Sequence, residues 1–501
     1  MTLTVLVTGA TGYIGGRLVP RLLAEGHAVR AMTRSASRLR DVPWADRVQV
    51  VEGDALGGTG LDRALAGVDV AYYLVHSIGE GGFEDTDRRA AAAFGAAAKE
   101  AGVGRIVYLG GLVPQHEELS PHLASRAEVG QLLLDSGVPT AVLQAAVIIG
   151  SGSASFEMLR YLTERLPAMI TPRWVNSRIQ PIAVRDVLRY LVGAATLPPE
   201  VSRRFDIGGP EVLTYLEMMQ RYARVAGLRK RLIIPVPLLT PRLSGHWVNV
   251  VTPVPAALAK PLVRSLVNEV VCSESDIRQH VADPPEGLLG FEESVGLALL
   301  RIREAAVETR WSSASWPGAP SDPLPSDPDW AGGSLYQDRR ERQVDADPQD
   351  LWRVIEGIGG EHGWYSFPLA WAVRGQLDRL VGGVGLRRGR RDPDQLYVGE
   401  SLDFWRVEEI VDQKLLRLRA EMKLPGAAWL ELGVDADENG RTLFVQRALF
   451  HPRGLAGHAY WWSVAPFHGV VFGGMLANIA GAAARAAATR RTAALGSGRA
   501  A

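Results

Sequence analysis

The sequence contains a single cysteine, and this scarcity limits where the protein is expected to work. Cys272 has no second thiol in the chain with which to form a disulfide. Its neighbours in NEVVCSE give no sign of thiol activation, so we interpret it as a packed side chain. No basic stretch precedes the first apolar run, LTVLV, as a signal peptide would require. We therefore predict a cytoplasmic protein.

An excess of either charge is also lacking. Lysine plus arginine equals aspartate plus glutamate, 55 against 55, which argues against binding nucleic acid through bulk charge. The chain has no Walker lysine after its glycine loop and no G-x-S-x-G turn. The ten histidines and one cysteine form no H-x-x-x-H or C-x-x-C pair, so we predict no metal site.

One long segment lacks charge altogether. Residues 464–484 contain no Asp, Glu, Lys or Arg, and their length would suit a membrane-spanning helix. Pro466, His468, Asn478 and four glycines dilute the hydrophobicity of this segment. We expect a buried or amphipathic C-terminal helix, with a weak membrane contact through this helix as the alternative.

Two kinds of pattern divide the 501 residues. Up to about residue 205, near-continuously apolar runs such as LTVLVTG and RIVYLGG alternate with helical patterns. This alternation predicts an α/β fold, a Rossmann-type doubly wound parallel sheet covered on both faces. We assign residues 1–310 to this domain, with a substrate lobe from about residue 206. Residues 311–334 are rich in Pro, Ser, Asp and Gly and are predicted to be a linker.

After the linker the period changes to two. KLLRLRAEMKL alternates strictly, which predicts a strand with Arg417 and Arg419 on a solvated face. AWLELGV and RTLFVQRALF, separated by DADENG, predict a hairpin. We assign residues 335–485 to a separate α+β domain with an antiparallel sheet, and residues 486–501 to a disordered tail.

The strongest motif is the glycine loop in LVTGATGYIGGRL. Glycines at a spacing of three, directly after a strand and opening a helix, let backbone approach a pyrophosphate at the helix N-terminus. This context predicts a dinucleotide site. The residues predicted to contact the dinucleotide here are Gly9, Thr11, Gly12, Tyr13, Ile14 and Gly15.

The ends of later strands supply the remaining candidates. Arg34, with Arg38 one turn on, suits a ribose 2′-phosphate, which favours NADP(H) over NAD(H); if Arg34 is only solvated, that preference stays open. Asp54 is placed either to accept from an adenine amine or to cap a helix. The other residues predicted at the mouth of the crevice are Ala55, Leu74, Val75, His76 and Gly110. His76 faces the ligand or is a satisfied histidine at a strand end.

These motifs resemble those of a known superfamily. TGATGYIG, the GD after the third strand and VRDV at 184–187 are similar to the short-chain dehydrogenase/reductase superfamily, in its atypical NmrA-like and sugar-epimerase-like branch. The resemblance covers about 300 residues. The C-terminal part, about 150 residues, resembles a domain of unknown function often fused to such reductases. Its order of elements is similar to the helix-grip fold of polyketide cyclases and START-type lipid carriers.

The resemblance implies catalytic positions that this sequence has changed. The superfamily's serine falls on Gly110 or Gly111, its tyrosine on His122 and its lysine on Arg126. His122 can exchange protons near neutrality. Arg126 cannot, but it could bind ribose hydroxyls or an anionic substrate and lower the pKa of His122. Alternatively, His122 only begins a helix after Pro121, and Arg126 pairs with a carboxylate in the neighbourhood of Glu128.

Two functions follow from these patterns. The first is an NADP(H)-dependent oxidoreductase that acts on a small, lipophilic carbonyl or alcohol, with His122 and Arg126 in non-standard catalytic roles. The second is a non-catalytic NAD(P)-binding redox sensor or assembly protein.

Overall fold

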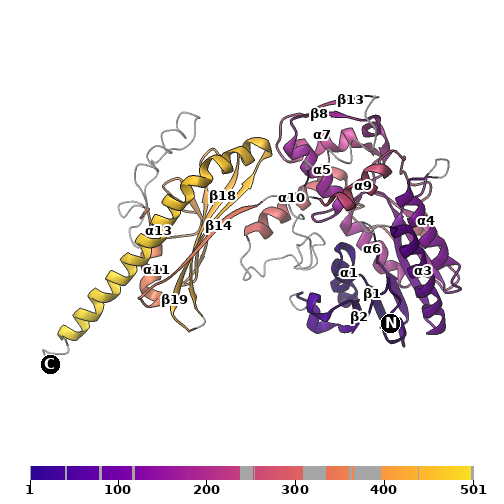
Figure 1. Cartoon of the computed structure of the whole chain (residues 1–501), viewed down its shortest axis with the longest axis horizontal. Coiled ribbons are helices and arrows are strands. Elements are labelled where there is room, and N and C mark those ends of the chain that lie inside the picture. The colour runs from indigo at the N-terminus through magenta and orange to yellow at the C-terminus, as the bar shows by residue number, and fades with distance from the viewer. Residues whose placement is uncertain are drawn as a thin grey trace. The chain divides into compact units, whose positions relative to one another are not determined.

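The computed structural model describes residues 2–39, 42–77, 82–114, 119–236, 252, 254–307, 335–359, 364–365, 396–437 and 439–497. The chain divides into two compact units, Met1–Gly333 and Ser334–Ala501 (Figure 1). The predicted linker at 311–334 lies outside the described residues.

The first unit is built on a seven-stranded parallel sheet. In spatial order its strands are β11 (Arg203–Ile207), β6 (Thr140–Ala145), β5 (Arg105–Gly111), β4 (Val70–Tyr73), β1 (Thr4–Thr8), β2 (Ala28–Thr33) and β3 (Gln49–Glu52). The chain builds outward from β1 through β2 to β3, then crosses back and continues from β4 on the other side. This order confirms the predicted Rossmann-type α/β fold.

Both faces of this sheet are covered, as the apolar strands predict. Val5 and Val7 of β1 pack in one core with α1 (Tyr13–Ala24) and α6 (Val184–Ala194). Leu6, between them, packs in another core with α3 (Phe83–Glu100) and α4 (Pro121–Leu134). Since neighbouring side chains of a strand point to opposite faces, one apolar strand contributes to both cores.

The sheet continues past the predicted start of the substrate lobe. β11 pairs in parallel with β6 and ends at Ile207, so residue 206 lies inside a sheet strand. Beyond it, α7 (Tyr215–Val225), α9 (Ala256–Ser265) and α10 (Phe291–Val307) form a third core with α5 (Ala154–Arg165). This lobe therefore also draws on an earlier segment of the chain.

The second unit contains a six-stranded antiparallel sheet, as predicted. Its order is β14 (Tyr336–Gln343), β19 (Thr442–Pro452), β18 (Gly426–Ala436), β17 (Leu415–Ala420), β16 (Trp405–Val411) and β15 (Ser401–Leu402). α11 (Pro348–Glu356) and α13 (Gly454–Ser497) share an apolar core with the sheet. The likeness to the helix-grip fold stays a prediction.

The face of β17 that was predicted to be solvated is partly buried. The Arg417 side chain is only 7% exposed and forms ion pairs with Glu409 and Glu431 on the flanking strands. Arg447 of β19 pairs with the same Glu431. Strict alternation identified the strand, but it could not show that opposite charges from four strands would pair with one another.

α13 corrects the predicted C-terminus. The helix continues to Ser497, so the prediction of a disordered tail from residue 486 is wrong for residues 486–497. Its stretch Gly454–Arg491 is long and apolar enough to span a membrane by length and composition alone, and 28% of its most apolar window is buried. The buried part includes Met475, Ile479 and Ala483, which pack against the sheet.

Candidate functional site

The turn between β1 and α1 leaves no room for side chains at its glycines. Gly9 has a φ of +70°, and a Cβ there would lie 2.5 Å from the Leu74 carbonyl oxygen. A Cβ on Gly15 would lie 2.2 Å from the carbonyl oxygen of Gly9. Gly12 caps α1 without a side-chain hydrogen bond, and the first turn of this helix carries no acidic residue. The helix N-terminus can therefore accept an anion.

A crevice of about 200 Å³ opens in front of this turn. Nine of the predicted residues line it: Gly9, Thr11, Gly12, Arg34, Asp54, Ala55, Leu74, Val75 and His76. They come from the carboxyl ends of β1, β2, β3 and β4, which adjoin in the sheet. The structure thus brings together residues up to 67 positions apart in sequence, since parallel strands end at the same edge.

Four predicted residues lie outside the lining of the crevice. The Tyr13 ring lies 4.3 Å from the Arg17 guanidinium, and its hydroxyl reaches the backbone of Gly150. Ile14 packs against the core under α1. Gly15 lies against Gly9, as described above. At Gly110 a Cβ would lie 3.0 Å from the Tyr108 ring, so this glycine makes room for an aromatic side chain.

The far end of the crevice carries two cations. Arg34 and Arg38 are exposed, and in the described part of the chain neither guanidinium has an ion-pair partner. Asp54 Oδ1 accepts from the Leu56 amide at 3.0 Å, in a turn that precedes α2 (Leu61–Leu65). Asp54 therefore stabilises its own turn and does not cap a helix.

Two histidines and an arginine gather beside the other end. α4 begins at Pro121, with Ser120 as its cap, which places His122 and Arg126 one turn apart. Burial, with a smaller contribution from Arg126, lowers the pKa of His122 to about 3, so its imidazole is neutral at pH 7. Burial, with smaller contributions from Arg126 and His122, also lowers the pKa of His76.

Among the described residues, Arg126 forms no ion pair with a carboxylate, which was the alternative prediction. Glu128 Oε1 accepts instead from Arg88 at 2.6 Å. The Arg126 Nη1 atom lies 3.5 Å from the Tyr108 hydroxyl. After burial, the Arg126 charge contributes to the lowered pKa of both histidines. Over the same described ranges, no group of three His, Cys, Asp or Glu residues could hold a metal ion.

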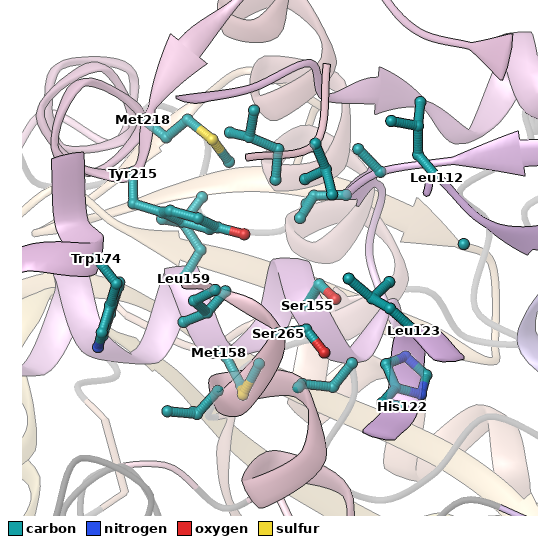
Figure 2. Close-up of a pocket in the computed structure, with 18 of the residues that line it drawn as sticks. Leu112, His122, Leu123, Ser155, Met158, Leu159, Trp174, Tyr215, Met218 and Ser265 are labelled. Atoms are coloured by element: carbon teal, nitrogen blue, oxygen red, sulfur yellow. The ribbon is translucent and has the colours of Figure 1, made fainter. Parts of the chain in front are cut away.

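A second cavity, of about 110 Å³, lies at the ends of β5 and β6 (Figure 2). Its walls come from α4, α5, α7 and α9 and are mostly apolar, with His122, Ser155, Tyr215 and Ser265 as the main polar side chains. The sequence reasoning missed every lining residue except His122 and Gly111. The amphipathic pattern of α7, with Met218 and Met219 on its buried side, was the available signal.

The two cavities occupy neighbouring stretches of one sheet edge. The crevice spans the ends of β3, β2, β1 and β4, and the apolar cavity begins at Gly111 of β5, the next strand. A dinucleotide with its phosphates at α1 and one ribose near Arg34 would extend its other end toward this cavity. The arrangement suits transfer between a cofactor and an apolar ligand.

Comparison with known proteins identifies both units. Residues 9–145 match a family described as NAD(P)H-binding, and residues 330–475 match one described as a protein of unknown function (DUF2867). A (4-alkanoyl-5-oxo-2,5-dihydrofuran-3-yl)methyl phosphate reductase of Streptomyces griseus is 29% identical over 224 residues, 44% of this chain and 74% of that protein. A ceramide reductase of Caulobacter vibrioides is 29% identical over 237 residues, 46% of this chain and 72% of that protein.

Among solved structures, Citrobacter sp. triphenylmethane reductase complexed with NADP(H) is similar to 59% of this chain and covers 99% of its own, with 21% identity and a TM-score of 0.47. The family matches coincide with the two folds: the first spans the glycine loop through β6, and the second spans the antiparallel sheet and part of α13. The chain therefore joins an NAD(P)H-binding Rossmann domain, with reductase and epimerase relatives, to a C-terminal DUF2867 domain.

Proposed function

We propose that this protein is an NADPH-dependent reductase that acts on a small, uncharged, lipophilic carbonyl compound in the cytoplasm. One observation carries the proposal: an apolar cavity adjoins the cofactor crevice along the same sheet edge. Two relatives are named as reductases, and one of them acts on ceramide, which supports a reduction and a lipophilic substrate.

The residues of the crevice fit the phosphates of a dinucleotide. Glycines at positions 9, 12 and 15 leave the space that side chains would fill, and the amides of the first turn of α1 would hold the pyrophosphate. Arg34 and Arg38 would hold a 2′-phosphate, which supports NADPH over NADH. When bound, the cofactor supplies the hydride.

The protein itself would orient the carbonyl and exclude water. The apolar walls contributed by α5, α7 and α9 leave little room for solvent near the reacting carbon. His122 is neutral, so it would donate a hydrogen bond from an uncharged ring and would not act as an imidazolium acid. Arg126, which stays charged, would favour negative charge that develops on the substrate oxygen.

A non-catalytic dinucleotide sensor or assembly protein is the second candidate. It is favoured by the loss of all three catalytic groups of the superfamily, at Gly110 or Gly111, at His122 and at Arg126. Such a protein would bind NADPH without consuming it, and His122 would then serve only the packing of α4.

Oxidation of NADPH in the presence of aliphatic ketones and aldehydes distinguishes the two. We expect slow turnover by the wild type and, for His122→Ala, a kcat lower by about tenfold or more. His280 lies away from both cavities, so His280→Ala is the matched control and should keep full activity.

The pH dependence of the rate gives a second measurement. Because the pKa of His122 lies well below neutrality, protonation of His122 should cause no loss of rate between pH 8 and about pH 5. Tight NADPH binding without turnover, unchanged in His122→Ala, would establish the sensor instead.

A further inference from the structure

Tyr215 lines the apolar cavity, and its hydroxyl has no hydrogen-bond partner among the described residues. The residue is only 7% exposed. Three other buried tyrosines of this unit do have partners: Tyr72 donates to the Leu191 carbonyl, Tyr190 to Asp283 and Tyr222 to Glu164. Because the Tyr215 hydroxyl borders the cavity and is bonded to none of the described residues, it is available to donate a hydrogen bond to a ligand there.

The fold holds this side chain in place. Tyr215 is the first residue of α7, and the preceding Thr214 forms a reciprocal capping box with Glu217 that fixes the turn. The ring packs edge-on against Trp174, with centroids 5.7 Å apart and planes at 90°. Figure 2 shows the hydroxyl directed into the cavity, toward the side where Ser155 and Leu123 lie. The position is therefore fixed before any ligand arrives.

The surroundings of this hydroxyl select the chemistry of a ligand. Leu112, Leu159 and Met218 contribute hydrocarbon, and none of the described residues that line the cavity carries a charged side chain. The nearby Ser265 hydroxyl is already engaged by Ser120 and the Pro261 carbonyl. Burial raises the pKa of Tyr215 well above its usual range, so the hydroxyl is a neutral donor. A neutral donor among hydrocarbon favours an uncharged acceptor, because an anion would lose its hydration without gaining a cation.

We propose that the Tyr215 hydroxyl donates a hydrogen bond to the oxygen of the substrate, and that the substrate is an uncharged carbonyl compound flanked by hydrocarbon. The proposal deepens the reductase function and rests on it for the identity of the ligand as a substrate. Tyr215 thereby supplies a donor in addition to the one proposed for His122 in the altered motif on α4. It lies about 90 residues downstream of that motif.

A pair of ring compounds tests this contact without turnover. The cavity holds about 110 Å³ and is not closed, whereas a closed apolar cavity of roughly 150 Å³ accommodates benzene, so a six-membered ring would fill this cavity and extend through its opening. Cyclohexanone carries an acceptor, and methylenecyclohexane has the same shape without one. Ligand-observed NMR titration of the full chain, free of cofactor, should show that Tyr215→Phe weakens cyclohexanone binding about tenfold and leaves methylenecyclohexane binding unchanged. Tyr190→Phe, which removes a buried hydroxyl outside the cavity, should alter neither.

Thermal unfolding without ligand gives a second readout. If the hydroxyl is unpaired in the free protein, Tyr215→Phe should keep or raise the Tm, since it removes an unsatisfied polar group. A lower Tm, or equal loss of both ligands, would assign Tyr215 a purely structural role and overturn the proposal. Binding of cyclohexanone can depend on Tyr215 even if the wild type does not oxidise NADPH. In that case the contact with Tyr215 is supported, and only the reductase function is refuted.

Discussion

Arg34 and Arg38 carry the expected preference between the two nicotinamide cofactors. Both guanidinium groups line the crevice, are exposed and have no ion-pair partner among the described residues. Removing a charge-assisted hydrogen bond to a phosphate costs about 1.5–3 kcal/mol, which corresponds to a loss in affinity of about tenfold to a hundredfold. We therefore expect Arg34→Ala to weaken NADPH binding by that factor and to leave NADH binding nearly unchanged, as measured by calorimetry.

Arg47→Ala provides the control for this measurement. Arg47 is an exposed arginine in a neighbouring segment that does not line the crevice, so its removal changes net charge equally without touching the site. If Arg34→Ala weakens NADPH and NADH binding to the same extent, Arg34 acts only through its net charge. It then does not bind the 2′-phosphate and does not explain a preference for NADPH.

At the scale of residues, sequence reasoning succeeded where the chemistry is local. The glycines of the first turn are needed within seven residues of one another, and the structure gives a steric reason for each. Tyr215 could not be found in this way. Its role depends on a cavity whose walls come from α4, α5, α7 and α9, and no spacing in the sequence places those helices around one point.

α13 carries large apolar side chains that the rest of its own unit does not cover. Its apolar, exposed side chains are Leu455, Trp462, Phe467 and Val470, the last three each 66% exposed. Residues 439–501 contain seven arginines and no acidic residue. Arg490 and Arg491 pair with Asp350 and Asp345, whereas Arg453 and Arg485 have no ion-pair partner in the described chain. Exposed aromatic side chains beside unpaired cations favour contact with an anionic lipid surface.

Vesicle flotation tests this contact. We expect the wild type to float with vesicles of phosphatidylcholine and phosphatidylglycerol, and less with phosphatidylcholine alone. The Phe467→Glu variant should stay in the bottom fraction of the gradient, because a carboxylate in the apolar face of α13 opposes insertion of this face into the lipid. Ala486→Glu adds the same charge at an exposed position of the same helix and should still float. If the wild type does not float but forms a dimer that Phe467→Glu separates, the face is an interface between two copies.

Strands and helices with a clear hydrophobic periodicity could be predicted from the sequence, and those with a weak periodicity could not. The apolar runs LTVLVTG and RIVYLGG became β1 and β5, and the hairpin of β18 and β19 formed where its alternation predicted it. β11 was missed because RRFDI contains only two buried apolar side chains, Phe205 and Ile207. The end of α13 was missed because ATRRTAAL lacks an apolar face, although its alanines favour a helix.

At the scale of the whole molecule, the two units have separate cores. Three apolar clusters lie within Met1–Gly333, and a fourth lies within Ser334–Ala501. The sequence located this division by its linker composition. It could not specify how the lobe after β11 would combine with α5, because that packing joins segments at least 50 residues apart in the sequence.

Separate cores predict separate responses to the cofactor. A ligand stabilises only the unit to which it binds, by about 2.7 kcal/mol when its concentration is a hundred times its Kd. In differential scanning calorimetry of the full chain we expect two transitions, of which NADPH raises only that of the Rossmann unit. Gly9→Val should abolish this shift, because its side chain would meet the Leu74 carbonyl and close the turn to the phosphates. Ala486→Glu, in the other unit, should leave it intact. A single transition that NADPH moves as a whole would mean that the DUF2867 domain unfolds together with the Rossmann domain, and that binding at the crevice stabilises both.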